Sequence, residues 1–182
     1  MGERKTYHRG RRKKKKGGII STLILIIAIA VFCVSGYQLY KIFGGYHQGK
    51  SEYDKVREVA VHGDDKDEDE FVVDFDELKK INADTVGWIR FYPEPSQISY
   101  PLVQTTDNDL YLNRTFSANE NTVGAIFVNC DNASDFSDRN TIIYGHRMRD
   151  HSMFHDLEKY KDESFWKENP YFYIYTPDGR KL

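Results

Sequence analysis

The sequence predicts one mainly β domain with inserted helices, of the α+β class, preceded by a transmembrane helix. Three observations support this prediction: an uncharged apolar run near the amino terminus, short segments rich in β-branched and aromatic residues after residue 70, and clusters of turn-forming residues between them. With 182 residues, 40% of them hydrophobic, the chain can form one packed core. We therefore expect a basic segment (1–18), a transmembrane helix (19–37), a juxtamembrane helix with an acidic linker (38–70) and a folded domain (71–182).

The amino-terminal segment is strongly basic. Residues 1–18 contain nine of the 26 Lys and Arg residues of the chain but only one of its 28 Asp and Glu residues. Such a cluster could bind nucleic acid, but it directly precedes the apolar run, which favours a role as the flank of a membrane helix. We expect no nucleic-acid partner.

The apolar run at 19–37 contains no charged side chain and, at about 1.5 Å per helical residue, is long enough to cross a membrane. A cleaved secretory signal is the alternative, but the run is longer than a usual signal core and no small-residue cleavage site follows it. Because Lys and Arg are retained on the cytoplasmic side, we expect a single-pass anchor in the cell membrane, in contact with lipid. Its amino terminus is then cytoplasmic and its carboxy-terminal domain extracellular.

The chain has two cysteines, and they predict no disulfide. Cys33 lies in the apolar run, where it packs as a small hydrophobic residue, and the bulky Phe32 before it excludes lipid attachment. Cys130 is the one cysteine after the run, so the folded domain has no partner for an intramolecular disulfide.

Two features are predicted between the membrane and the folded domain. Apolar residues at helical spacing predict a juxtamembrane helix that begins near Gln48, after the interruption at Gly44 and Gly45. Residues 62–70 form a dense acidic block that repels itself, which predicts a solvated linker. A calcium loop is the alternative, but the glycine and terminal glutamate of such a loop are missing at the required spacing.

The folded domain begins with a short helix that ends at Ile81 and is capped by Asp74 or Asp76. Pro101 falls within a predicted strand, so it must lie at a sheet edge or an irregular point. The strand at 171–175 leads into the turn TPDG, yet 180–182 is too short to pair along it, so we expect the domain to be incomplete. The other elements follow the same patterns: strands at 86–91, 98–104, 124–129 and 140–146, and helical segments at 107–113, 151–160 and 162–167.

The strand at 140–146 ends in a histidine, His146, directly after Gly145. The end of a strand holds a side chain firmly, and histidine is the residue best suited to acid–base chemistry near neutral pH. The alternative is a structural histidine that only makes hydrogen bonds.

Several segments around His146 resemble the class B sortases, which are cysteine transpeptidases of the Gram-positive cell surface. They are VGWIRF, YPLVQ, YLNRTF, GAIFVN, TIIYGHRM, SMF and DLEKYKDESFW, in the order of the family. The resemblance implies that 71–182 forms part of a sortase-like β-barrel, that His146 is catalytic, and that Asn108 and Leu112 line the groove for a sorting-signal peptide. A helix cap for Asn108 and a core position for Leu112 are the alternatives.

The resemblance also implies a reaction that uses no cofactor and no metal. A cysteine thiolate attacks a carbonyl of the sorting-signal peptide of a surface protein, an amine of the peptidoglycan precursor resolves the thioacyl enzyme, and His146 acts as general acid and base beside an arginine. The family's TLxTC word, which holds the cysteine, and the context of its arginine do not occur among the 182 residues. Cys130 lies in a polar loop without that context, so we expect a truncated chain that is inactive by itself.

A metal hydrolase is one alternative function. His151 and His155 lie four apart on a predicted helix, which allows two ligands on one face, and His146, Asp150 and Asp156 are near in sequence. The glutamate of an HExxH motif is missing, and we assign no metal ligand.

A membrane-anchored module without catalytic activity is the other alternative. Such a module could bind a peptide or a wall polymer through exposed aromatic residues, with Trp88 and Trp166 as the strongest candidates. The competing interpretation places both tryptophans in the core.

Overall fold

The computed structural model describes residues 17–63 and 70–182. It divides into two compact units, residues 1–41 and residues 42–182. The predicted basic segment, apart from its last two residues, and the centre of the acidic linker (64–69) lie outside the described residues.

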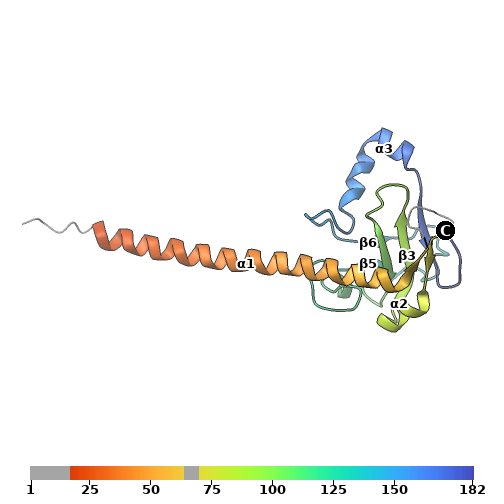
Figure 1. The fold of residues 1–182 in the computed structure, drawn as a ribbon, viewed down its shortest axis with the longest axis horizontal. Helices are drawn as coiled ribbons and strands as arrows, with labels where there is room; N and C mark the ends of the chain where they lie inside the picture. The colour runs from red at the N-terminus through yellow and green to blue at the C-terminus, as the bar shows by residue number, and fades with distance from the viewer. Residues whose placement is uncertain (1–16, 64–69) are drawn as a thin grey trace, which may run out of the picture. The chain divides into compact units, whose positions relative to one another are not determined.

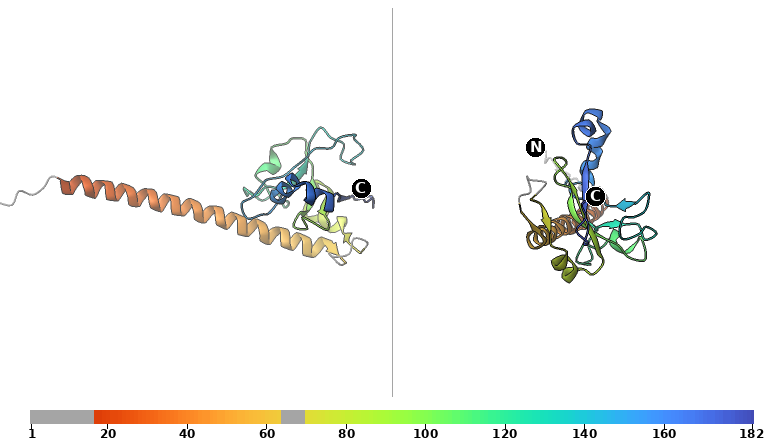
Figure 2. Two further views of the ribbon diagram at one scale, coloured as in Figure 1. Left: turned by 90° about the horizontal axis from the view of Figure 1, so that it is seen from above. Right: turned by 90° about the vertical axis from the view of Figure 1, so that its right-hand side faces the viewer.

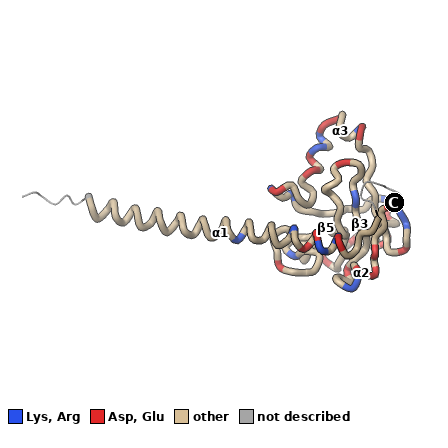
Figure 3. Tube along the Cα trace, in the orientation of Figure 1, with Lys and Arg blue, Asp and Glu red and all other residues tan. Residues whose placement is uncertain are grey.

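The first described element is a single helix, α1 (Gly17–Ala60; Figure 1). Its residues before Lys41 carry no charge (Figure 3), and by length and composition it can cross a membrane. The predicted interruption at Gly44 and Gly45 is wrong, because the helix continues through both. A helical glycine costs only about 1 kcal/mol relative to alanine, which the turns on either side outweigh.

A five-stranded mixed sheet, curled into part of a barrel, forms the centre of the second unit (Figures 1 and 2). β3 pairs antiparallel with both β4 and β7, β4 pairs parallel with β5, and β5 pairs antiparallel with β6. The predicted α+β class is confirmed. The strand bounds are β3 (Thr85–Phe91), β4 (Ser99–Val103), β5 (Ile126–Val128), β6 (Ile143–Tyr144) and β7 (Phe172–Tyr175), and a separate pair consists of β1 (Val61–His62) and β2 (Val72–Val73).

Pro101 lies on β4, the central strand of the sheet, at a position that is paired on one side only. It pairs with Trp88 of β3, whereas the pairing of β4 with β5 begins only at Leu102. The missing N–H of the proline therefore costs no hydrogen bond to β5.

Among the described residues, four short helical segments lie between the strands. α2 (Phe75–Ile81) is capped as predicted, because the Asp74 carboxylate accepts a hydrogen bond from the Glu77 backbone N–H at 3.0 Å. η1 (Leu110–Leu112) lies within the helical segment predicted at 107–113, and α3 (Glu163–Glu168) overlaps the one predicted at 162–167. α2 and α3 lie at opposite ends of β3 (Figure 1).

The helix predicted from residue 151 begins only at residue 155, as η2 (His155–Lys161). His151 and Met153 have φ angles of 65° and 56°, which no right-handed helix allows. A long-range contact holds this backbone, because the Met153 N–H donates to the Tyr100 hydroxyl at 3.1 Å.

The turn after β7 returns the chain along that strand, as the TPDG sequence predicts. The Thr176 N–H donates to the Arg180 carbonyl at 3.1 Å, and Ile174 and Leu182 exchange two backbone hydrogen bonds of 2.9 Å. The return segment is thus paired, and the prediction that 180–182 is too short to pair along the strand is wrong.

The core of the second unit fills the space between the sheet and the carboxy-terminal turns of α1. Tyr53, Val56 and Ala60 of α1 are buried in it. Gly49 allows the close approach, since a Cβ at that position would lie 3.0 Å from a methyl group of Val123. The largest fully buried side chains of the core are those of Leu78, Trp88, Ile98, Leu102, Phe116 and Ile126.

We expect Tyr53→Phe to lower the free energy of unfolding by about 1–3 kcal/mol, the cost of leaving buried polar groups unsatisfied. The Tyr53 hydroxyl donates to the Gly124 carbonyl at 2.8 Å and accepts from the Phe116 N–H at 3.2 Å. Urea unfolding followed by circular dichroism in detergent measures the difference. Tyr171→Phe, at an exposed position, is the control, and equal stability of both variants would contradict the prediction.

Candidate active site around His146

His146 follows β6, and its half-buried ring is fixed by one backbone group. Nε2 lies 2.6 Å from the carbonyl oxygen of Leu112. A carbonyl only accepts hydrogen bonds, so we assign the proton of the neutral ring to Nε2, which leaves the lone pair on Nδ1. His146 is thereby arranged to take up and release a proton at Nδ1.

Gly124 provides the space for this ring. Its φ angle of 66° disfavours any residue with a side chain. A Cβ at this position would lie 2.8 Å from Cδ2 of His146 and 2.9 Å from the Leu112 carbonyl oxygen. The GAIFVN segment therefore begins with a glycine because the histidine packs against its backbone.

Gly145, the residue before His146, also has no room for a side chain. A Cβ there would lie 2.4 Å from Cδ1 of Ile126 and 2.6 Å from a ring carbon of Phe154. The Phe154 N–H in turn donates to the His146 carbonyl at 2.9 Å. Both the ring and the backbone of the histidine are thus held by neighbouring segments.

We expect Gly124→Ala to destabilise the folded domain by about 1–3 kcal/mol, the cost of a strained backbone, and to displace the His146 ring. Urea unfolding and the NMR signals of the histidine-labelled chain measure the two effects. Gly44→Ala is the matched control, because a Cβ there meets no atom within 4 Å. An unshifted His146 signal in the Gly124→Ala variant would contradict this prediction.

Leu112, which the resemblance assigns to the peptide groove, contacts His146 through its carbonyl. The turn that carries it is anchored by Asp107, whose carboxylate accepts from the N–H groups of Leu110 and Asp109, both at 2.8 Å. These two bonds, that of Leu110 first, hold the pKa of Asp107 below its usual range. The position of Leu112 is therefore set by local hydrogen bonds of η1.

Asn108 lies in the same turn, just before η1. Its side-chain oxygen accepts from the Cys130 N–H at 2.9 Å, and its amide donates to Asn129 at 3.3 Å. The structure therefore joins Leu112 to His146, but it joins Asn108 to the loop after β5.

Two pockets lie near these residues, and His146, Asn108 and Leu112 are not among the lining residues of either. The first, of about 770 Å³, opens beside η1. The second, of about 570 Å³, is lined by α1, by β3 and β4, and by residues 150–153 of the loop after β6. Sequence reasoning missed it because its walls come from segments far apart in the chain. Its polar and aromatic lining includes Tyr53, Asp54, Arg57, Arg90, Tyr100 and His151.

No family model matches the sequence. Sortase B of Listeria monocytogenes is 35% identical to the chain over 155 residues, which cover 81% of this chain and 60% of that protein. Sortase B of Staphylococcus aureus is 30% identical over 148 residues, with the same shares. A crystal structure of sortase B from Bacillus anthracis matches with a TM-score of 0.63 and 35% identity, over 73% of this chain and 63% of that chain.

The chain is a homologue of the class B sortases. The sortase B structure from Clostridium perfringens agrees, with 36% identity and a TM-score of 0.55 over 59% of this chain and 57% of that one. The chain spans about 60% of the length of the curated sortases it matches.

Cys130 and His146 follow two neighbouring strands at different ends of their pairing. β5 and β6 pair Val128 with Ile143 and Phe127 with Tyr144. Because the two strands are antiparallel, Cys130 comes after the carboxy-terminal end of β5, whereas His146 comes after β6, beside the amino-terminal end of β5.

Proposed function

We propose that this protein is a membrane-anchored, sortase-type cysteine transpeptidase and that residues 71–182 supply its catalytic histidine. The observation that carries the proposal is the fixed geometry of His146, within a segment homologous to class B sortases. A half-buried ring with one nitrogen bound to a backbone carbonyl and the other carrying a lone pair suits a general acid and base.

The proposed reaction joins surface proteins to the cell wall. The cysteine thiol gives its proton to Nδ1 of His146, the resulting thiolate attacks a carbonyl carbon of the sorting-signal peptide, and the C–N bond breaks as that proton passes from Nδ1 to the departing amine. An amine of the peptidoglycan precursor then attacks the thioester, gives its proton to Nδ1 and releases the thiolate. The TLxTC word of the family is absent from residues 1–182, and Cys130 lies in a loop without that context.

The groove and the anchor complete the proposal. The side chains of Asn108, just before η1, and of Leu112, its last residue, form part of the wall that receives the peptide. The amino-terminal part of α1 crosses the cell membrane, with the basic segment in the cytoplasm and the domain outside. This topology places the transpeptidase where surface proteins and wall precursors meet.

We expect the purified chain of residues 1–182 to cleave no member of a library of fluorogenic sorting-signal peptides. Listeria monocytogenes sortase B is the positive control, and Cys130→Ala is expected to change nothing. Measurable turnover that disappears in Cys130→Ala would overturn the assignment of Cys130. Sequencing the gene beyond the codon for Leu182 tests the family activity, since an in-frame Thr-Cys word followed by a strand with an arginine would restore the enzyme.

A further inference from the structure

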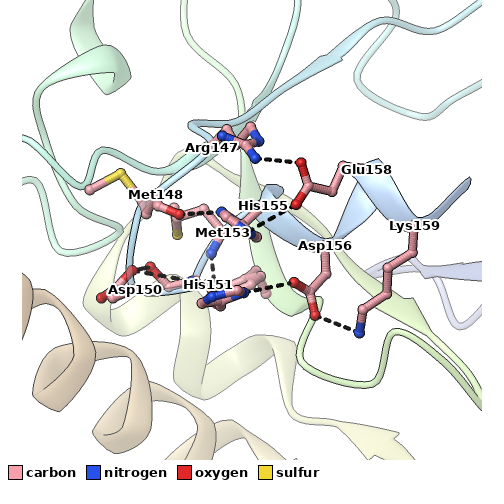
Figure 4. Close-up of polar contacts among 11 residues, drawn as sticks. Arg147, Met148, Asp150, His151, Met153, His155, Asp156, Glu158 and Lys159 are labelled. Carbon is pink, nitrogen blue, oxygen red and sulfur yellow. Dashed lines mark hydrogen bonds and ion pairs between the residues drawn. The ribbon is translucent and has the colours of Figure 1, made fainter. Parts of the chain in front are cut away.

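The loop between β6 and η2 folds back on itself and presents a cluster of ionisable side chains (Figure 4). An antiparallel bridge between Arg147 and Met153 closes the loop. At its tip, the Asp150 carboxylate accepts from the Ser152 hydroxyl at 2.7 Å. Although His151 lies in this loop and not on a helix, its ring centroid is only 4.1 Å from that of His155.

The nitrogen and oxygen atoms of this cluster are spaced for a metal ion. One ligand atom each from His151, His155 and Asp156 lies within 4.8 Å of the other two, and Nδ1 of His151 is 3.5 Å from Oδ1 of Asp156. Tetrahedral zinc, with bonds of about 2.0–2.1 Å, places its ligand atoms roughly 3.4 Å apart. The His151 side chain is 70% exposed, so a small rotation of its ring can close the remaining gap.

A backbone carbonyl, that of Met148, orients the ring of His155. Its Nδ1 binds the Met148 carbonyl, so we assign the proton of the neutral ring to Nδ1 and the lone pair to Nε2. Nε2 lies 3.3 Å from Oε1 of Glu158. With this tautomer both atoms are acceptors, so they can face the same cation. A carbonyl behind the ring is also the arrangement that fixes metal-binding histidines.

Each of the two carboxylates of the cluster contacts a basic side chain, Asp156 that of Lys159 and Glu158 that of Arg147. Burial raises the pKa of Asp156, but the bonds from Lys159 and His151 outweigh it and bring the net pKa below the usual value. Lys159 contacts Oδ2 at 2.9 Å, so Oδ1 remains on the side of His151. The Arg147 guanidinium lowers the pKa of Glu158 in the same way.

We propose that His151, His155 and Asp156 bind one divalent transition-metal ion, with zinc as the probe of choice. Two imidazoles favour zinc, nickel or copper over magnesium and calcium, which prefer oxygen ligands. Three protein ligands leave a fourth position open to water or to Glu158. The ion links the loop after His146 to η2, and this site replaces the sequence-based expectation that the chain has no metal ligand.

The test is a zinc titration of the full chain, purified in detergent and freed of metal, against a chromophoric chelator. We expect one ion per chain and at least about tenfold weaker binding in His151→Ala. That variant removes an exposed ring, so the fold is retained, and circular dichroism confirms this. His47→Ala removes an exposed histidine outside the cluster and is expected to bind like the wild type.

Cobalt gives a second readout that does not depend on affinity. Tetrahedral coordination by His151, His155 and Asp156 produces a visible absorption band, which we expect to disappear in His151→Ala and in Asp156→Asn. Equal zinc binding by the wild type and His151→Ala would overturn the proposal, because the ion would then be held by other groups. Absence of zinc binding by the folded wild type would overturn it as well. Neither result depends on transpeptidase activity.

Discussion

Trp88→Ala is expected to lower the free energy of unfolding of the folded domain by about 3–5 kcal/mol, the usual cost of deleting a large buried aromatic side chain. Trp88 lies in the middle of β3, between Pro101 of β4 and Tyr175 of β7, and is only 1% exposed. Its indole N–H donates to the Ser99 hydroxyl at 3.0 Å, so the substitution also removes a partly buried hydrogen bond. A loss of this size is a large part of the stability of an ordinary domain.

The second tryptophan provides the control. Trp166 lies on α3 and is 47% exposed, so Trp166→Ala is expected to cost less than about 1 kcal/mol. Urea unfolding followed by far-ultraviolet circular dichroism compares both variants without relying on tryptophan fluorescence. Equal losses in the two variants would mean that β3 is not the centre of the core. Of the two sequence-based interpretations of the tryptophans, the core position is confirmed for Trp88 and wrong for Trp166.

The sequence predicted those elements that local signals determine. The Asp74 cap of α2, the β-branched and aromatic residues of β3, and the TPDG turn after β7 each act within a few residues, so the pattern contained the answer. The helix predicted from His151 failed for the opposite reason. Its backbone is set by the hydroxyl of Tyr100, which lies far away in the sequence.

The candidate site was predictable to the same limited degree. In the sequence His146 stands out because it ends a predicted strand, directly after a glycine. The carbonyl that determines its tautomer belongs to Leu112, and no local sequence pattern indicates this contact. The four-residue spacing did indicate His151 and His155 as a pair, but it predicted both on one helix, whereas His151 lies in the loop before η2. Their rings meet because the loop reverses, and only the fold determines that.

His146→Ala is expected to lower kcat about 10²–10⁴-fold in the product of a reading frame that includes the sorting cysteine, which is the usual contribution of a general acid and base. The leaving amine and the incoming amine both exchange a proton with Nδ1 in the proposed reaction, and alanine has no group to replace it. Initial rates of peptide cleavage and of transfer to an amine acceptor measure the effect. His47→Ala is the control for removing a histidine outside the site.

His146→Gln separates the chemistry of the ring from its structural contact. The glutamine amide can still donate to the Leu112 carbonyl, but it cannot take up a proton near neutral pH. If His146 is the acid and base, the glutamine variant folds with nearly wild-type stability and is as inactive as the alanine variant. A glutamine variant with near wild-type kcat would instead make His146 a structural residue, because the bond to Leu112 would then account for its whole effect.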